Sequence, residues 1–239
     1  MQEESVLLEQ PAVHPLLRAC TRALLLLCRP LLLHRIRRPV IEEVNGVPFV
    51  LVPAVQNPVV FRSGAWFAQE IAALGPVSAG SSVLDMGTGS GICAVFAARL
   101  GYRVVGVDLN PAAARCARLN VLLNQMEDRI EVREGDLFFP VMSERFDLVL
   151  FNPPFFRGQP KPGDLFDLSW RSTDVFERFA AGLQAVLKPG GRALVLLSTD
   201  GNGKEMLRAL KEHNFRIESF ACRNFGNEIM TIYSASAAS

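Results

Sequence analysis

The stretch Asp85-Met86-Gly87-Thr88-Gly89-Ser90-Gly91 decides the expected fold of this chain. A short apolar run, Ser82-Val83-Leu84, precedes it, and the apolar run Ile92–Leu100 follows it with the character of a helix. A strand, a glycine turn and a helix in this order are typical of an open α/β sheet, in which the glycines let the backbone approach a nucleotide closely. We therefore expect a nucleoside ligand at this turn.

A second motif, Asn152-Pro153-Pro154-Phe155, follows the apolar run Phe146–Phe151 and so stands at the carboxyl end of another strand. Open α/β sheets bind their ligands at that edge. The Asn152 side-chain oxygen and the Pro153 carbonyl can both accept hydrogen bonds from the N–H groups of a planar amide or amino nitrogen. They would then hold this nitrogen in place and stabilise the positive charge that develops on it. Phe155 offers a flat face for a base or an amide plane. The alternative is that the motif is only a stiff turn.

Downstream of the glycine turn, apolar strands alternate with helical stretches, which is the pattern of a parallel sheet. Asn110 and Pro111 mark the start of one helix, and Lys188-Pro189-Gly190-Gly191 indicates a turn that ends another. The last two strands follow one another directly and predict an antiparallel hairpin. The sequence therefore predicts an α/β fold with a Rossmann-like, mostly parallel sheet of seven strands. These strands are expected at residues 83–85, 103–107, 130–132, 146–151, 193–197, 215–220 and 228–233.

Composition sets limits on the function. The chain has 239 residues, 49% of them hydrophobic, which suits one domain with a large core and an N-terminal extension. A net charge of +1 does not demand a polyanionic partner. The five cysteines lack CxxC spacing and the three histidines are scattered, so we expect no metal. We expect reduced thiols and a cytoplasmic protein.

The N-terminal segment is rich in leucine and arginine. Arg29-Pro30 interrupts its apolar run, so no stretch reaches the roughly 18 residues of a membrane span, and we expect no membrane partner. Two short helices broken at Pro30 are expected instead. Six arginines and no acid lie in residues 18–38. They form either a basic arm that contacts RNA or a ribosomal surface, or a solvated helical face whose leucines pack on the domain, and we favour the second.

A hairpin is expected after this segment, because Asn45-Gly46 is a strong turn signal and Val47–Val52 has the character of an edge strand. We take residues 1–60 as an accessory segment of short helical and β elements. Residues 61–239 are then the catalytic domain.

Acidic residues stand at the carboxyl ends of three expected strands. Asp85 can bind an ammonium group, and Asp108 can accept hydrogen bonds from both ribose hydroxyls. Asp136 can accept a hydrogen bond from an adenine amino group, while Leu137 covers a face of the ring. Together they fit a cationic nucleoside cofactor. The alternative is an NAD or FAD site, but Asp85 would repel a pyrophosphate and the glycine spacing is GxGxG rather than GxGxxG.

The run from Val83 to Phe156 resembles the S-adenosylmethionine-dependent N-methyltransferases of the small-domain type. It is most similar to the HemK-like group, which includes the release-factor glutamine methyltransferases. The resemblance implies an enzyme that uses S-adenosyl-L-methionine. The implied catalytic residues are Asn152, Pro153, Pro154 and Phe155. The implied cofactor contacts are Asp85, Gly87, Thr88, Gly89, Gly91, Asp108, Leu109, Asp136, Leu137 and Asn152.

The methyl acceptor stays open between classes. The leading expectation is a planar amide or amino nitrogen of a macromolecule, either a protein such as a release factor or RNA or DNA. The alternative is a small-molecule methyltransferase, in which residues 156–172, with Phe166 and Trp170, form a lid over the acceptor. A cofactor-binding scaffold without catalysis is disfavoured by the intact Asn152 motif. Glutamine methyltransferases usually carry Tyr where Phe155 stands, and the sequence predicts no oligomeric state.

Overall fold

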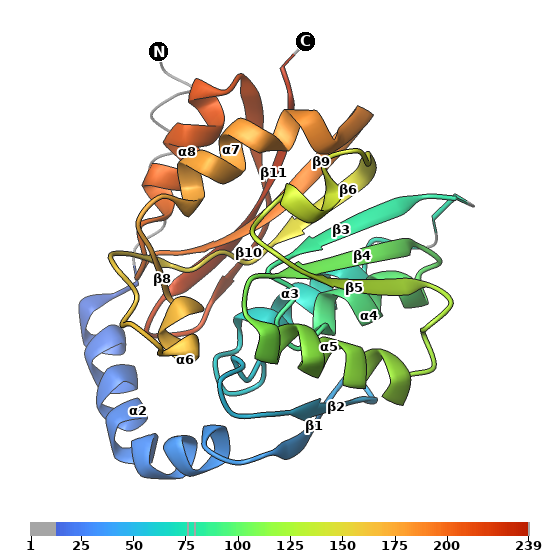
Figure 1. Ribbon diagram of the computed structural model, residues 1–239. Coiled ribbons are helices and arrows are strands. Elements are labelled where there is room, and N and C mark those ends of the chain that lie inside the picture. Colours follow the sequence, from blue (N-terminus) through green and yellow to red (C-terminus); the bar gives the residue numbers. More distant parts are fainter. Residues whose placement is uncertain (1–12, 76, 79, 239) are drawn as a thin grey trace.

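A seven-stranded sheet forms the centre of the computed structural model, which describes residues 13–75, 77–78 and 80–238 (Figure 1). The strand order is β10-β11-β9-β6-β3-β4-β5, and five neighbouring strands, from β9 to β5, run parallel. The last two strands pair antiparallel, which confirms the predicted α/β fold and its C-terminal hairpin. The strands are β3 (Ser82–Met86), β4 (Arg103–Asp108), β5 (Ile130–Glu134), β6 (Phe146–Phe151), β9 (Leu187–Ser198), β10 (Phe215–Asn224) and β11 (Ile229–Ala237).

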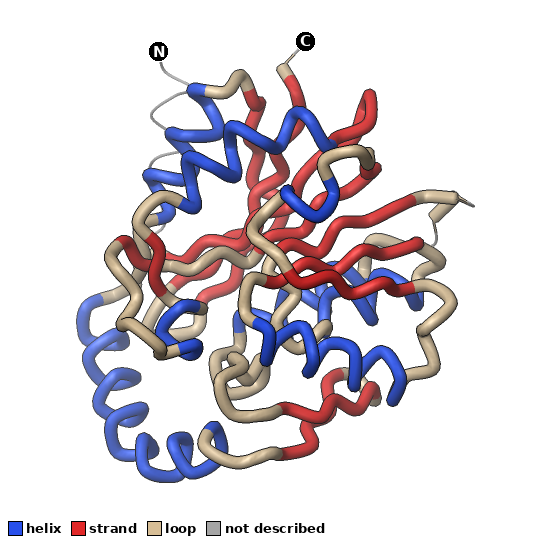
Figure 2. Tube along the Cα trace, viewed as in Figure 1, coloured by secondary structure: helices blue, strands red, loops and turns tan. Residues whose placement is uncertain are grey.

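Helices cover both faces of this sheet, as Figure 2 shows. The first face carries α3 (Ser63–Ala72), α4 (Ile92–Arg99) and α5 (Pro111–Leu123), and the second carries α7 (Val175–Val186) and α8 (Gly203–Glu212). Strand β3 contributes to the core on both faces of the sheet, because Val83 is buried under the helices of the first face and Leu84 under those of the second. Successive side chains of a strand point to opposite faces, so a strand covered on both sides is apolar throughout.

The start of α5 follows the sequence signals. The Asn110 side chain accepts a hydrogen bond from the Ala112 N–H at 2.9 Å, and Pro111 occupies the first turn. Helix α5 therefore begins only three residues after β4 ends. Its first turn lies at the same edge of the sheet as the glycine turn.

The predicted hairpin is present, with Asn45 and Gly46 at positive φ between β1 (Val40–Val44) and β2 (Val47–Leu51). It packs on α5, where the Asn120 side chain accepts from the Val50 N–H and donates to the Val50 carbonyl. Phe49 is buried in the same core as α3 and α4. The hairpin therefore shares a core with the rest of the chain, and the boundary at residue 60 stays a prediction.

Two expectations for the N-terminal segment were wrong. One helix, α2 (Pro15–Ile36), replaces the two expected, with Pro30 inside it. Proline removes one helical hydrogen bond and kinks a helix but need not end it, and α2 bends visibly along its length (Figure 1). Most leucines of α2 do not pack on the domain either, since Leu16, Leu24, Leu27 and Leu31 are exposed, whereas Leu25 and Leu32 are partly buried.

The expected turn at Lys188–Gly191 is instead a bulge within β9. Phe146 pairs with Leu187 and Leu148 with Arg192, so the residues between them loop out of register while the strand continues. Gly190 has φ of 76°, which explains how the chain bulges there.

The connection from β6 to α7 is long and contains β7 (Phe156–Arg157), α6 (Leu165–Leu168) and β8 (Arg171–Ser172). A single 3-10 turn, η1 (Phe139–Val141), follows β5 among the described elements.

Candidate functional site

The glycine turn between β3 and α4 bends sharply at the carboxyl edge of the sheet. Gly87, Gly89 and Gly91 all have positive φ, at 65°, 58° and 78°. A side chain at Gly91 would also lie only 3.2 Å from the Cα of Ala117 in α5, so this position must be glycine for the helices to pack closely. The turn therefore exposes backbone rather than side chains at this edge.

Asp85 supports the turn from beneath. Its Oδ2 accepts hydrogen bonds from the Thr88 hydroxyl at 2.6 Å and from the Ala94 N–H at 3.1 Å, and the residue is buried. Burial raises the pKa of this carboxyl to about 7, against the opposing effect of these hydrogen bonds. The geometry therefore gives Asp85 a supporting position beneath the turn, and its contact with an ammonium group stays a prediction.

Asp108 lies at the end of β4 and faces the same edge. Its Oδ2 accepts a hydrogen bond from the Gly89 N–H at 2.8 Å, and its Oδ1 accepts one from the Asn110 N–H at 2.8 Å. Burial raises its pKa to about 6, although both hydrogen bonds favour the ionised form. The carboxylate thus links the glycine turn to the α5 cap.

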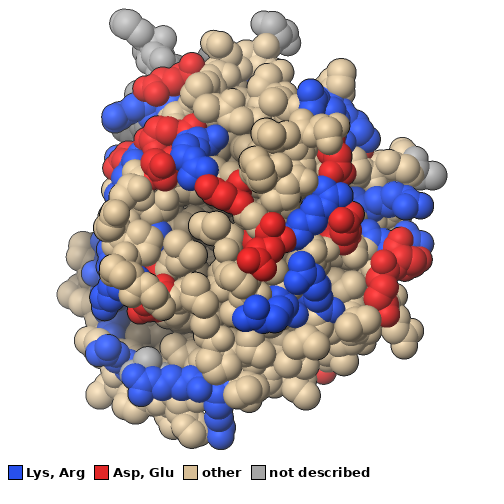
Figure 3. Space-filling view, viewed as in Figure 1, with Lys and Arg blue, Asp and Glu red and all other residues tan. Residues whose placement is uncertain are grey.

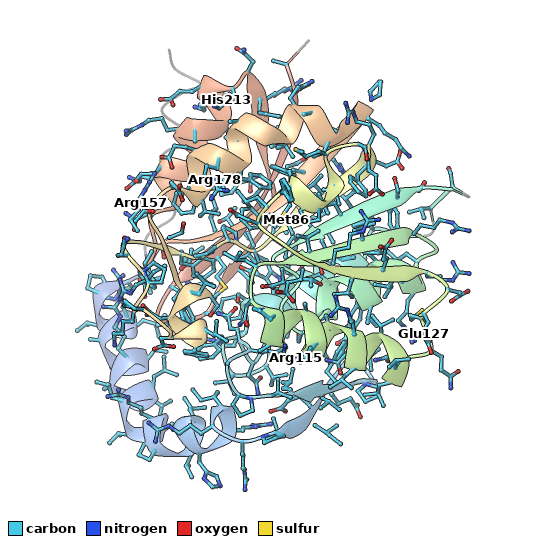
Figure 4. All side chains as sticks on the ribbon, viewed as in Figure 1. Met86, Arg115, Glu127, Arg157, Arg178 and His213 are labelled. Atoms are coloured by element: carbon cyan, nitrogen blue, oxygen red, sulfur yellow. The ribbon has the colours of Figure 1, made fainter. Side chains whose placement is uncertain are left out.

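These elements surround an open cavity with about 950 Å³ of empty space, its mouth included. Half-exposed Leu109 and Leu137 give it apolar walls. Arg178 of α7 also lines it and donates a hydrogen bond to Asp136 at 2.5 Å. Figure 4 shows Arg178 and Met86, a second lining residue, near the middle of the molecule.

Asn152 follows β6 and lines the cavity. Its Nδ2 donates to the Ser63 hydroxyl at the start of α3, at 3.4 Å, which turns the other end of the amide away from Ser63. Its Oδ1 is buried and finds no hydrogen-bond partner among the described residues. A buried acceptor without a donor is rare and unfavourable, by about 1–3 kcal/mol, so it marks the place for a ligand N–H.

The turn before α3 holds Ser63 in place. Arg62 has φ of 65°, and its guanidinium donates to Asn227 Oδ1 at 2.6 Å and to the Phe225 carbonyl at 3.3 Å. It also lies over the Phe225 ring, 4.9 Å from the centroid. The hairpin turn between β10 and β11 therefore stabilises a strained residue beside Ser63.

The rest of the Asn-Pro-Pro-Phe motif divides between the cavity and the core. Pro154 lines the cavity. Phe155 is buried, with its ring edge-on to Trp170 at 6.3 Å and its carbonyl accepting a hydrogen bond from the Asn202 N–H at 2.7 Å. The Phe155 ring thus packs in the core beside Trp170, and its use as a stacking face for the acceptor stays a prediction.

The structure brings most of the predicted site residues to one cavity. Among the described residues, the predicted ones that line it are Gly87, Gly89, Asp108, Leu109, Asp136, Leu137, Asn152 and Pro154. The predicted ones outside the lining are Asp85, Thr88, Gly91, Pro153 and Phe155.

Sequence reasoning missed the lining residues Val55 and Gln56, which reach the cavity from the segment after β2. Leu165 and Leu168 of α6 cover one side of the cavity and belong to residues 156–172, the segment expected as a lid in one alternative. The Asn110 Nδ2 ties both segments to the α5 cap, donating to the Ala54 carbonyl at 2.9 Å and the Leu165 carbonyl at 3.4 Å. Only tertiary packing brings Val55 and Gln56 to the cavity, and their local sequence carries no signal for it.

Two features are absent from the residues that the structure describes. These residues contain no cluster of three or more His, Cys, Asp or Glu side chains that could hold a metal ion. Within the same residues, no helix has both the length and the apolar character needed to cross a membrane.

A sequence model of the methyltransferase small domain matches residues 68–219 of the chain. The chain belongs to this family. This methyltransferase is 34% identical over 146 residues to a putative protein N5-glutamine methyltransferase of Methanocaldococcus jannaschii, over 57% of this chain and 71% of that protein. It is 31% identical over 146 residues to a tRNA1(Val) (adenine(37)-N6)-methyltransferase of Porphyromonas gingivalis, over 57% of this chain and 56% of that protein.

Solved structures share the fold of this methyltransferase. A 16S rRNA N2 methyltransferase of T. thermophilus, in complex with AdoMet and guanosine, superposes with a TM-score of 0.62 at 19% identity. The superposition covers 84% of this chain and 50% of that chain. The matched part thus spans about half the length of several relatives.

S-adenosylmethionine is the methyl donor expected of a member of the methyltransferase small-domain family. Two solved proteins that share the fold were crystallised with AdoMet and guanosine or with S-adenosyl-L-homocysteine. The cavity of this methyltransferase fits such a molecule. It offers glycine backbone, a carboxylate at Asp108, apolar walls at Leu109 and Leu137, and the unbonded oxygen of Asn152 beside them.

Proposed function

We propose that this methyltransferase places a methyl group on a planar amide or amino nitrogen of a macromolecule. One observation carries the proposal, namely the buried and unbonded Asn152 Oδ1 in the lining of the cavity. An acceptor nitrogen that bears an N–H supplies the missing donor. An oxygen or carbon nucleophile without such a hydrogen leaves the acceptor unsatisfied.

The chain's own residues mainly position the nitrogen. When bound, S-adenosylmethionine supplies an electrophilic methyl group. Ser63 fixes the Asn152 amide so that Oδ1 faces the cavity, and Oδ1 then accepts the N–H of the substrate. The Pro153 carbonyl is proposed as a second acceptor. Both oxygens stabilise the positive charge that grows on the nitrogen as the methyl arrives, and fixed dipoles need no reorganisation to do so.

The cofactor contacts are proposed from the same lining. Asp108 accepts the ribose hydroxyls, Leu109 and Leu137 enclose the adenine, and the turn at Gly87–Gly89 lies against the methionine part. Asp136 keeps its predicted role at the adenine amino group, with its carboxylate oriented by Arg178. Asp85, Thr88 and Gly91 act through the shape of the turn, and Pro154 and Phe155 through that of the acceptor site.

A macromolecular acceptor is supported by the names of the two relatives, which describe a protein glutamine and a tRNA adenine methyltransferase. The five free cysteines fit a reducing compartment, so we place the reaction in the cytoplasm. One observation favours a small-molecule acceptor instead: the predicted lid covers part of the cavity with Leu165, Leu168 and Arg171.

Transfer from radiolabelled S-adenosylmethionine into a fractionated lysate tests the acceptor class. We expect label in protein or RNA, released by hydrolysis as an N-methyl amino acid or nucleoside. Label in the small-molecule fraction alone would establish the lid alternative, and methyl on oxygen or carbon would contradict the proposed chemistry.

Replacing Asn152 by alanine tests the mechanism. We expect methyl transfer to fall by about 10²-fold or more, with cofactor affinity largely unchanged, because the oxygen acts on the developing charge. The matched control is Asn124→Ala, since Asn124 donates to the Pro48 carbonyl on the hairpin. Near-normal turnover of Asn152→Ala on the identified acceptor would refute the mechanism.

A further inference from the structure

Helix α2 carries an exposed apolar stripe that the proposed reaction does not use. Leu16, Leu24, Leu27 and Leu31 are 71%, 59%, 78% and 75% exposed, and none of the α2 side chains that the structure describes is buried. Scattered exposed leucines are ordinary, but this concentration on one helix is not. In Figure 1, α2 lies along the outer edge of the molecule, away from the helices that cover the sheet.

The spacing of the stripe is that of a helix–helix seam. Five exposed residues of the stripe follow one another at intervals of three, four, three and four residues: Leu17, Cys20, Leu24, Leu27 and Leu31. This interval keeps side chains on one side of a helix and lets them interlock with a second helix. Pro30 is the expected cause of the bend, so Leu17–Leu27 lie on the straight part before it.

Three arginines of α2 lie away from the stripe, and two of these three form ion pairs within the chain. At 100° per residue, Arg18, Arg22 and Arg29 lie roughly opposite to the stripe. Arg18 and Arg22 both pair with Asp200, the second at 2.9 Å, and Arg35 pairs with Glu42 at 2.5 Å. The stripe is therefore electrically neutral along most of its length, and two such helices would not repel one another there.

The same arrangement argues against other occupants. A helix that lies in an anionic lipid surface needs basic side chains beside its apolar face, where they reach the headgroups. Figure 3 shows basic side chains along the lower left edge of the molecule, where Figure 1 places α2. Of the α2 arginines, Arg18 and Arg22 lie opposite to the stripe and pair with Asp200, and Arg35 pairs with Glu42. A nucleic acid would be recognised through cations and not through leucine.

We propose that the α2 stripe is the interface for a second copy of this chain, which pairs the two α2 helices about a two-fold axis. The five leucines Leu16, Leu17, Leu24, Leu27 and Leu31 expose at most roughly 600 Å² per copy, about three quarters of the roughly 800 Å² that each partner buries in a standard interface. A two-fold axis makes one stripe its own complement, so no further partner surface is required.

The position of α2 makes this interface part of the enzyme and not a loose appendage. Asp200, which holds Arg18 and Arg22, lies two residues from Asn202, whose N–H donates to the Phe155 carbonyl. Thr21 packs against Gly226, where a Cβ would lie 2.8 Å from the Thr21 hydroxyl. The proposal is independent of the acceptor, because it uses no residue of the cavity.

Sedimentation of the full chain under reducing conditions tests the proposal. We expect a mass of twice 26.3 kDa, which falls to 26.3 kDa in the double variant Leu24→Glu, Leu27→Glu. The matched control is Leu122→Glu, Leu123→Glu, an adjacent pair of exposed leucines on α5. We expect the control to remain a dimer, and circular dichroism to show both variants folded, since all four side chains face solvent.

Four results would overturn the proposal. A wild-type chain of 26.3 kDa at the highest concentration reached would exclude a dimer, and a dimer that survives the α2 changes would place the interface elsewhere. Loss of the dimer in the α5 control would place the interface on α5. A monomer that co-sediments with phosphatidylglycerol vesicles, and loses this in Leu24→Glu, Leu27→Glu, would assign the stripe to a lipid surface.

Discussion

Acidification should weaken cofactor binding through Asp108. Burial raises the pKa of this carboxyl to about 6 in the free protein. The ribose hydroxyls donate more strongly to the ionised carboxylate than to the neutral acid, so they lower this pKa on binding, and affinity falls as the pH drops through 6. The direction follows from the fact that the bound state holds fewer protons than the free state.

The magnitude follows from the titration. A carboxyl with a pKa of about 6 is about 90% ionised at pH 7 and about 10% at pH 5. If only the ionised form binds, affinity falls about tenfold between these values, or about 1.4 kcal/mol. The α-amino group of the ligand stays protonated in this range, and none of the described residues that line the cavity is a histidine.

Calorimetry with S-adenosylmethionine from pH 5 to pH 7 measures this dependence. Asp108→Asn should lose it and bind about 1.5–3 kcal/mol more weakly at pH 7, because a charged acceptor is replaced by a neutral one. Asp85→Asn is the matched control for the second carboxyl with a raised pKa. Its oxygen can still accept the Thr88 and Ala94 hydrogen bonds, which both reach Oδ2, so the pH dependence should remain. An affinity that is constant or rises on acidification would refute this role of Asp108.

Two further predictions concern stability and positioning. Gly91→Ala should lower the free energy of unfolding by about 2–4 kcal/mol, because it adds backbone strain at positive φ and brings a Cβ within 3.2 Å of Ala117. Gly46→Ala is the control, since Gly46 has almost the same φ but open space around it, and it should lower the free energy of unfolding by only about 1 kcal/mol. Equal melting temperatures for the two variants would contradict the packing argument. Ser63→Ala should reduce kcat by about 2–10-fold with unchanged cofactor affinity, because the Asn152 amide loses one hydrogen bond. An unaltered kcat in steady-state assays would show that Ser63 does not orient Asn152.

The central fold was predictable because its signals are local. The run before Asp85 is apolar, the glycines after it permit positive φ, and Asn110 and Pro111 start α5 as their side-chain chemistry requires. The order of strands and helices then leaves few topologies open. The bulge at Lys188–Gly191 escaped prediction because the same residues suit a turn and a strand interruption equally.

The site residues were predictable only where they follow directly on a strand. Asp108 and Asn152 each come at the end of an apolar run, and the carboxyl ends of parallel strands meet at one edge of the sheet, so both residues line the same cavity. Ser63 comes from a helix on the first face, so its contact with Asn152 depends on packing between distant segments. The same limit applies to Asp85, because the sequence places it at the turn but does not show which way its carboxylate points.

The clamp on Arg62 links the order of synthesis to the readiness of the active site. Its partner Phe225 is 163 residues further along the chain, so Arg62 waits for nearly the whole protein to emerge before its left-handed conformation is stabilised. The contact by which Ser63 orients Asn152 therefore depends on the last hairpin of the chain, although both residues are made long before it.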